Sequence, residues 1–239
     1  MIGQPLRLFD VVSSTNDIAR EWAQDGAPHG AAVSALGQTA GRGRRARSWQ
    51  SSPGLGLYLS LVLRPKSDAP LTRWTLIVAV AAARAIESEI QNAGTPRALQ
   101  LKWPNDILLG GCKIGGILCE SGNGALIAGI GLNINQDATD LPERPLFPAS
   151  SLKLQTGREW NLEALQNRFF LEMSMIESQD WQTIRAEFER RCPLWGEAVK
   201  VVGENETYYG VASGVDEDGV LLVATPDGPR RVIAGDVQY

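Results

Sequence analysis

The chain has 239 residues, enough for one sizeable hydrophobic core or for a large domain with a small one beside it. With 44% hydrophobic residues, 21% charged residues and a net charge of −4, it is not a generally basic protein that would bind nucleic acid or anionic membranes over its whole surface. The longest apolar run, residues 74–83, is too short to cross a bilayer, and the N-terminus lacks a signal-peptide pattern. Three cysteines without C-x-x-C spacing do not indicate a disulfide framework, so we expect a cytoplasmic protein with free thiols and no membrane partner.

The first part of the chain alternates strand-length apolar segments with helical patterns. Strands are expected at 6–12, 31–36 and 56–65. Between the first two, Ser14 and Asp17 fit a helix N-cap and an acidic first-turn residue, and Gly26 can end that helix. An alanine-rich segment predicts a long, mostly buried helix at 72–90.

The middle of the chain predicts a second group of strands, followed by two helices. The segment 98–109 has the pattern of two strands broken at Pro104, and a Gly-Gly turn follows it. Further strands are expected at 113–121 and 125–135, and helices at 161–179 and 181–191.

The character of the sequence changes after Pro193. Short alternating segments separated by Gly, Asp and Asn predict a small antiparallel barrel or sandwich. We therefore expect two domains, residues 1–192 and 193–239. The larger one mixes strands and helices without strict βαβ alternation, which favours an α+β fold with a mixed sheet.

The segment GRGRRARSW, residues 41–49, concentrates four arginines within 42–47 of a mildly acidic chain. Gly41 and Gly43 would let backbone N–H groups approach an anion closely, and guanidinium groups suit carboxylates and phosphates. The segment has neither the G-K-[ST] of a P-loop nor a G-x-G-x-x-G pattern. From the residues alone, a solvated basic loop and a nucleic-acid contact remain open beside a site for a small anion.

Two other features could carry chemistry. In LKWPNDI, residues 101–107, strand alternation puts Lys102 on the opposite face from Leu101 and Trp103, either in solvent or in a polar pocket. Glycines within the strands KIGGIL (113–118) and GIGLNIN (129–135) indicate close approach of a ligand or of another element.

Together these segments resemble a known family. SSTN at 13–16, QTAGRGRRARSW at 38–49, KWPNDI at 102–107, KIGGIL and GIGLNIN occur in an order and spacing similar to biotin protein ligases. The resemblance runs from about residue 6 to the C-terminus, and GRGRRxRxW with KWPND is its most specific part. It implies the fold of class II aminoacyl-tRNA synthetases and biotinyl ligases, with a C-terminal SH3-like barrel.

The resemblance also implies an activity. Such enzymes join biotin and ATP to biotinoyl-5′-AMP, release pyrophosphate, and pass biotin to one lysine of the biotin carboxyl carrier protein, an acetyl-CoA carboxylase subunit. Mg²⁺ would accompany ATP, with no tightly bound prosthetic group, no other metal and no nucleic-acid partner. The enzyme would be a monomer or a homodimer.

The resemblance assigns site residues as well. Ser14, Thr15, Asn16 and Gln38 would surround the ureido head of biotin; Gly41, Arg42, Gly43 and Arg44 would cover its carboxylate and the phosphates; Gly115 and Gly116 would form the wall of the biotin pocket; Trp49 and Asn133 would lie at the adenylate; and Lys102, with Arg44, would be catalytic.

Two departures from the family pattern matter. Ala46 stands where the family often has glycine, and alanine would cost on the order of 1 kcal/mol if that position needs a positive φ. Some bacterial members begin with a DNA-binding domain that represses biotin synthesis genes. Here the matching region starts within the first ten residues, so we expect a ligase without that domain.

Three alternatives stay open. A lipoate-attaching enzyme of the same fold would lack the KWPND and arginine segments. A nucleic-acid-binding protein would need a basic barrel, whereas residues 196–239 contain three basic and eight acidic side chains. A hydrolase would use His29, but the chain contains no G-x-S-x-G motif.

Overall fold

The computed structural model describes residues 1–239 except 66–68, 95–96, 123, 143–147 and 204–205. Its main element is a seven-stranded sheet in the order β1-β2-β3-β7-β6-β5-β4. The bounds are β1 Leu6–Val12, β2 Ala32–Gln38, β3 Gly56–Leu63, β4 Gln100–Lys102, β5 Asp106–Leu109, β6 Cys112–Gly122 and β7 Ala125–Asn133. Only the pairing of β1 with β2 is parallel, so the sheet is mixed.

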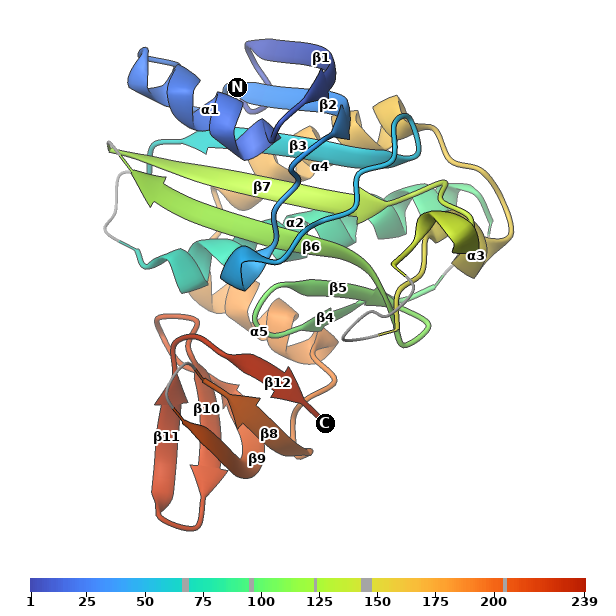
Figure 1. The fold of residues 1–239 in the computed structure, drawn as a ribbon. Helices are drawn as coiled ribbons and strands as arrows, with labels where there is room; N and C mark the ends of the chain where they lie inside the picture. The colour runs from blue at the N-terminus through green and yellow to red at the C-terminus, as the bar shows by residue number, and fades with distance from the viewer. Residues whose placement is uncertain (66–68, 95–96, 123, 143–147, 204–205) are drawn as a thin grey trace.

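Helices cover the two faces of this sheet unequally (Figure 1). One face packs against α2 (Leu71–Asn92), α4 (Leu162–Ile176) and α5 (Trp181–Arg191), and this side holds the main hydrophobic core. The small side chains of the central α2 segment, Ala79 and Ala81–Ala83, are fully buried and allow close packing.

The other face is covered only at one end. The helix α1 (Thr15–Gln24) packs on β2, β3 and β7 over a small second core that includes Ala19, Ala23 and Val33. Beyond α1, the connection between β2 and β3, with the short 3₁₀ turn η1 (Arg44–Ala46), crosses in front of β7 and β6. Residues of β6 and β7 beneath this crossing line a cavity.

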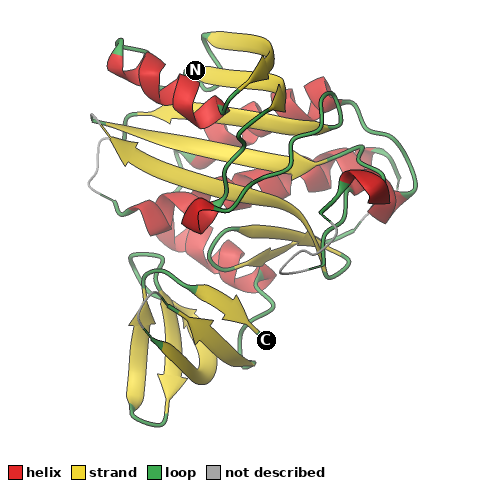
Figure 2. Cartoon of the chain, viewed as in Figure 1, coloured by secondary structure: helices red, strands yellow, loops and turns green. Residues whose placement is uncertain are grey.

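A second, five-stranded sheet follows α5 and forms a separate small layer (Figure 2). Its strands are β8 Ala198–Val202, β9 Thr207–Val215, β10 Leu221–Thr225, β11 Gly228–Val232 and β12 Asp236–Gln238, all antiparallel in the order β11-β10-β9-β8-β12. Trp103 of the large part donates its indole N–H to the carbonyl of Gly219, at 3.1 Å, and thereby ties the two parts together.

The predicted α+β fold with a mixed sheet and a small antiparallel C-terminal domain is confirmed. The strands and long helices lie close to their expected positions, and the break in 98–109 is a tight turn at Trp103–Asn105 with a cis peptide bond before Pro104. The predicted helix 161–179 is too long, because α4 ends at Ile176. Short elements were missed: η1, η2 (Ala138–Asp140) and α3 (Leu152–Thr156), whose few residues carry too little periodicity to be recognised.

Candidate active site

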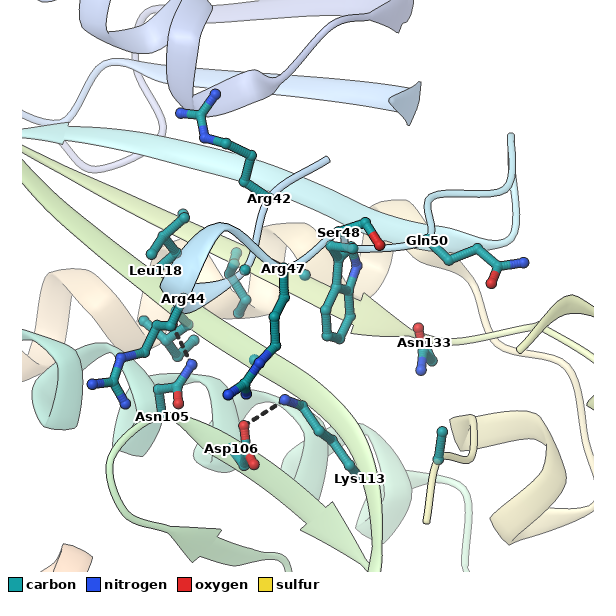
Figure 3. A pocket seen from close by; sticks show the side chains of 18 of the residues that line it. Arg42, Arg44, Arg47, Ser48, Gln50, Asn105, Asp106, Lys113, Leu118 and Asn133 are labelled. Carbon is teal, nitrogen blue, oxygen red and sulfur yellow. Dashed lines mark hydrogen bonds and ion pairs between the residues drawn. The ribbon is translucent and has the colours of Figure 1, made fainter. Parts of the chain in front are cut away.

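A cavity of about 660 Å³ opens on the uncovered face of the large sheet. Its size is typical of sites for small organic ligands. Several parts of the chain meet around it: the start of α1, Gln38 with the segment 42–50, the facing parts of β6 and β7 with the β4–β5 turn, residues 140–142 with Ala149, and the C-terminal residues 236–239. Figure 3 shows how side chains from these segments converge.

One wall of the cavity is neutral and rich in hydrogen-bonding groups. The backbone N–H of Thr15 donates to Gln38 Oε1 at 2.9 Å, and Ser60 Oγ donates to Asn16 Oδ1 at 2.6 Å. Ser14 occupies the N-cap position of α1, as expected, but its hydroxyl caps no backbone N–H and makes no hydrogen bond with a described residue. The Ser14 hydroxyl is therefore available to a ligand.

The arginines of the 42–47 segment point in different directions (Figure 3). Arg42 turns away from the others and forms two hydrogen bonds with the Asp17 carboxylate, at 2.5 and 2.8 Å. The bond to Asp17 raises the pKa of Arg42, and the bond from Arg42 lowers the pKa of Asp17. Glu120 lies 3.4 Å from the same guanidinium, so the charge of Arg42 is already neutralised by protein carboxylates.

Arg42, Arg44 and Arg47 all line the cavity, and Arg44 is the one without a carboxylate partner among the described residues. Its side chain runs past Asn105 of the β4–β5 turn (Figure 3), and it makes no ion pair with any described residue. Burial lowers the pKa of Arg44, although the charges of Asp236 and Asp106 oppose the shift. A partly buried cation of this kind interacts more strongly with an incoming anion than a fully exposed one, because less water screens it.

Two lysines and one aspartate complete the cationic wall. Lys102 is only 7% exposed, which settles the choice left open by strand alternation in favour of the polar pocket. Burial lowers its pKa, while Asp106, 4.0 Å away, opposes the shift. Lys113 Nζ lies 2.5 Å from Asp106 Oδ1 (Figure 3). Both ammonium groups therefore lie against the Asp106 carboxylate at the cavity wall.

Glycines bring the strands close to the side chains above them. A Cβ on Gly131 would lie 2.6 Å from Trp49 Nε1, and a Cβ on Gly129 would overlap the Asn16 amide. The expected close approach at the glycine-bearing strands is therefore confirmed. The Trp49 indole N–H is buried and has no hydrogen-bond partner among the described residues. Asn133, at the end of β7, donates to the Ser150 carbonyl at 3.0 Å and also lines the cavity.

Comparisons with known proteins match this architecture to a family. Residues 8–137 match the biotin/lipoate A/B protein ligase family, and residues 195–239 match the biotin protein ligase C terminal domain. The chain belongs to this family. The first description covers biotin and lipoate ligases together, whereas the second names biotin protein ligases alone.

Relatives and solved structures agree with this assignment. A bifunctional ligase/repressor from Bacillus spizizenii is 36% identical over all of this chain, which spans 75% of that protein. A biotin–[acetyl-CoA-carboxylase] ligase from Paracoccus denitrificans is 33% identical, with 87% of this chain and 89% of the relative covered. The biotin protein ligase from Aquifex aeolicus in complex with biotin and ATP has a TM-score of 0.85 at 29% identity, with 98% of each chain covered.

Most residues that the ligase resemblance implied line the cavity. They are Ser14, Thr15, Asn16, Gln38, Arg42, Gly43, Arg44, Trp49, Lys102, Gly116 and Asn133. Gly41 and Gly115 do not: a Cβ on Gly41 would meet the Trp49 carbonyl, and one on Gly115 would meet the Leu132 side chain. These two glycines do not line the ligase cavity but allow neighbouring groups, which do not leave room for a Cβ, to pack closely beside it.

Several cavity residues were missed by sequence reasoning. Lys113 is the first residue of KIGGIL and Asp106 is the last residue of KWPND. Both line the cavity, and their positions in these ligase-like motifs could have identified them. Arg47 was one of four similar arginines. The C-terminal stretch 236–239 carried no local signal, because only the packing of the small domain brings it to the cavity.

Other residues considered for catalysis lie elsewhere. His29 Nδ1 accepts the backbone N–H of Arg64 and Nε2 lies 3.0 Å from Glu177, which gives it a structural role outside the cavity. All three cysteines lie in the described part of the chain, and none lines the cavity. None of the described helices has the length and hydrophobicity of a membrane span.

Proposed function

We propose that this chain is a biotin protein ligase that adenylates biotin with ATP and transfers the biotinoyl group to a lysine of a biotin carboxyl carrier protein. Family membership and the names of its relatives support this reaction. The structural observation that carries it is one cavity with two chemically different walls. A neutral, hydrogen-bonding wall suits the ureido group of biotin, and a cationic wall suits its carboxylate beside a triphosphate.

Buried position and hydrogen-bonding capacity support the proposed roles at the neutral wall. Ser14, Thr15 and Asn16 are 2–4% exposed, and together with Gln38 they offer donors and acceptors to a ureido group. An amide buried without such partners would cost roughly 1–3 kcal/mol, so these side chains can select for the ureido ring. Gly116 and Gly129 keep the pocket floor open.

At the cationic wall, we assign Arg44, Lys102 and Lys113 to the anions. Adenylation requires a carboxylate oxygen to attack the α-phosphorus of ATP while pyrophosphate leaves. The two anions repel each other, so fixed positive charge at the point of approach lowers the barrier. The side chains reach this point from three different segments, and the ligand needs no covalent bond to the enzyme. Trp49 and Asn133 are assigned to the adenosine part.

Mg²⁺ enters the proposal with ATP, where it would neutralise phosphate charge. In the described ranges, no three His, Cys, Asp or Glu side chains gather into a metal site. This fits an ion held mainly by phosphates and water, as Mg²⁺ at nucleotides usually is. Asp106, which lies 4.0 Å from Lys102 and 2.5 Å from Lys113, is the residue we assign to contact it.

The reaction is tested by isotope exchange. Purified protein with ATP, Mg²⁺ and labelled pyrophosphate should exchange label into ATP when biotin is added, and not when lipoic acid replaces it. Exchange supported by lipoic acid instead of biotin would transfer the assignment to the lipoate branch of the family.

We also propose that residues 1–192 form the catalytic domain, that the protein is cytoplasmic, and that it is a monomer or a homodimer.

Replacing Arg44 with alanine is expected to weaken retention of biotinoyl-AMP more than stability. Arg44 lines the cavity and pairs with no carboxylate among the described residues. Loss of a charged donor to a buried anion costs about 1.5–3 kcal/mol, which corresponds to release roughly ten- to a hundred-fold faster. Filter binding of labelled biotinoyl-AMP over time measures release. Arg185→Ala, on α5 and outside the cavity, is the control, and equal release rates for the two variants would contradict the role.

Replacing all three cysteines with serine is expected to leave biotin transfer from biotinoyl-AMP intact. Burial raises the pKa of the Cys119 thiol to about 12 and that of Cys192 to about 11, so neither is a ready thiolate nucleophile. The mixed anhydride is already activated, and the acceptor lysine needs only to be positioned near it. Transfer is measured with a carrier-protein fragment. A covalent biotinoyl-enzyme that forms and decays at the rate of transfer would overturn this prediction.

A further inference from the structure

The arginine segment 42–47 forms ion pairs with Asp236, a residue outside the sequence motifs of the site. Arg45 Nη1 lies 3.0 Å from Asp236 Oδ2, and an Arg47 Nη nitrogen donates to the same carboxylate oxygen. Asp236 belongs to β12 of the small C-terminal domain, whereas the arginines lie almost two hundred residues earlier. One carboxylate therefore bridges the two parts of the protein at the mouth of the cavity.

The segment between these two ion pairs is strained. Arg45 and Ala46 have φ values of 56° and 55°, a left-handed conformation that residues with a Cβ adopt reluctantly. Two successive residues of this kind persist only where surrounding contacts hold them. Within the turn, the Gly43 N–H donates to the Arg47 carbonyl at 2.8 Å. From outside, the ion pairs of Arg45 and Arg47 with Asp236 flank Ala46 on both sides and hold the turn against the small domain.

Asp236 stands on a strand that is built into the small domain. β12 pairs with β8, and Val237, next to Asp236, is buried in the domain core. The domain in turn is fixed to the large part through the Trp103–Gly219 hydrogen bond and through a hydrogen bond of 2.5 Å from the Thr72 hydroxyl to the Asp218 carbonyl. A carboxylate on such a base can hold a loop in one place.

The four arginines of the segment differ in their carboxylate partners. Arg42 is bound by Asp17 and Glu120, while Arg45 and Arg47 are bound by Asp236. Arg44 alone of the four makes no ion pair with a described residue, although it lines the cavity as Arg42 and Arg47 do. The anchored arginines at its two sides fix the backbone that carries it.

We propose that Asp236 is a positioning residue that closes the arginine segment over the cavity and, given the proposed ligase function, retains the acyl-adenylate beneath it. The contact couples the small C-terminal domain to the active site without placing Asp236 on the reacting atoms. Because these side chains are 24–42% exposed, dissolved salt screens the contact and weakens retention.

The first test uses trypsin, which cleaves after arginine, on the unliganded protein. Asp236→Asn should be cut within 42–47 at least tenfold faster than wild type, whereas Asp236→Glu should restore protection. The control, Glu206→Gln, makes the same charge change on the same domain, where Glu206 pairs with Arg230. Equal cleavage of Asp236→Asn, Glu206→Gln and wild type would overturn the proposal.

The second test measures escape of biotinoyl-AMP at low and high salt. Escape from wild type should become several-fold faster with salt, whereas Asp236→Asn should be fast at both concentrations. Asp236→Arg combined with Arg45→Asp and Arg47→Asp should slow escape again, which a loss of folding could not do. Equal escape from Asp236→Asn and wild type at low salt would overturn the proposal. If wild type forms no biotinoyl-AMP, the proposed reaction fails, while the trypsin result still decides whether Asp236 holds the loop.

Discussion

Replacing Lys102 with methionine is expected to slow biotinoyl-AMP formation by about 10²–10³-fold, the usual effect of removing one donor to developing negative charge. Lys102 is buried at the end of β4, beside the point where carboxylate and triphosphate would meet. Methionine keeps most of the side-chain volume and removes the charge. Single-turnover formation of biotinoyl-AMP from bound biotin and ATP measures the step.

The same substitution should leave the protein at least as stable as wild type. Burial lowers the pKa of Lys102 below its value in the unfolded chain, so over the interval between the two pKa values the unfolded state binds more protons. Stability then rises with pH across that interval, and the full penalty of the buried charge is present below it. Lys102→Met removes this penalty together with the contacts of the ammonium group, while Asp106 keeps its ion pair with Lys113.

Thermal unfolding at a series of pH values tests this second expectation. The Tm of Lys102→Met should equal or exceed that of wild type at pH 7, and the difference should shrink toward alkaline pH, where wild-type Lys102 is neutral in both states. Lys200→Met, on β8 and outside the cavity, is the matched control and should keep adenylation. Near wild-type adenylation by Lys102→Met would remove Lys102 from the catalytic assignment.

Sequence reasoning reached the fold because its signals are local. The apolar segments, the alanine-rich helix and the Gly-rich turns each depend on a few neighbouring residues, and tertiary structure agreed with them. The alternation around Lys102 showed that it opposes Leu101 and Trp103, but not whether its face met solvent. That depends on the segment 42–50, which crosses the sheet from elsewhere in the chain.

The arginine segment shows where the sequence stops being informative. Four similar side chains predict an anion site, yet their partners decide which one serves it. Asp17 and Glu120 hold Arg42, and Asp236 holds Arg45 and Arg47. None of these carboxylates stands at a spacing that marks it as a partner. The conditional expectation for Ala46 is met, since its φ is 55° and the alanine is strained there.

Replacing Gly129 with alanine is expected to raise the KM for biotin at least tenfold. Gly129 lies on β7 at the floor of the cavity, and the added Cβ would overlap the Asn16 amide. That amide is held from both ends, because Asn16 Oδ1 accepts from Ser60 at 2.6 Å and Nδ2 donates to Glu120 at 2.7 Å. The amide must move into the cavity and break at least one bond, which costs about 1–3 kcal/mol for the buried group left unpaired.

The kinetic pattern separates this effect from a general loss of structure. Because the overlap disturbs the neutral wall and not the cationic one, biotin affinity should fall while the KM for ATP changes little in pyrophosphate exchange. Gly122→Ala is the matched control, since a Cβ there has no neighbour within 4 Å. Asn16→Ala combined with Gly129→Ala removes the overlap, so the double variant should regain stability relative to Gly129→Ala without regaining biotin affinity. Full recovery of biotin affinity in the double variant, or an unchanged KM in Gly129→Ala, would show that the Asn16 amide does not contact biotin.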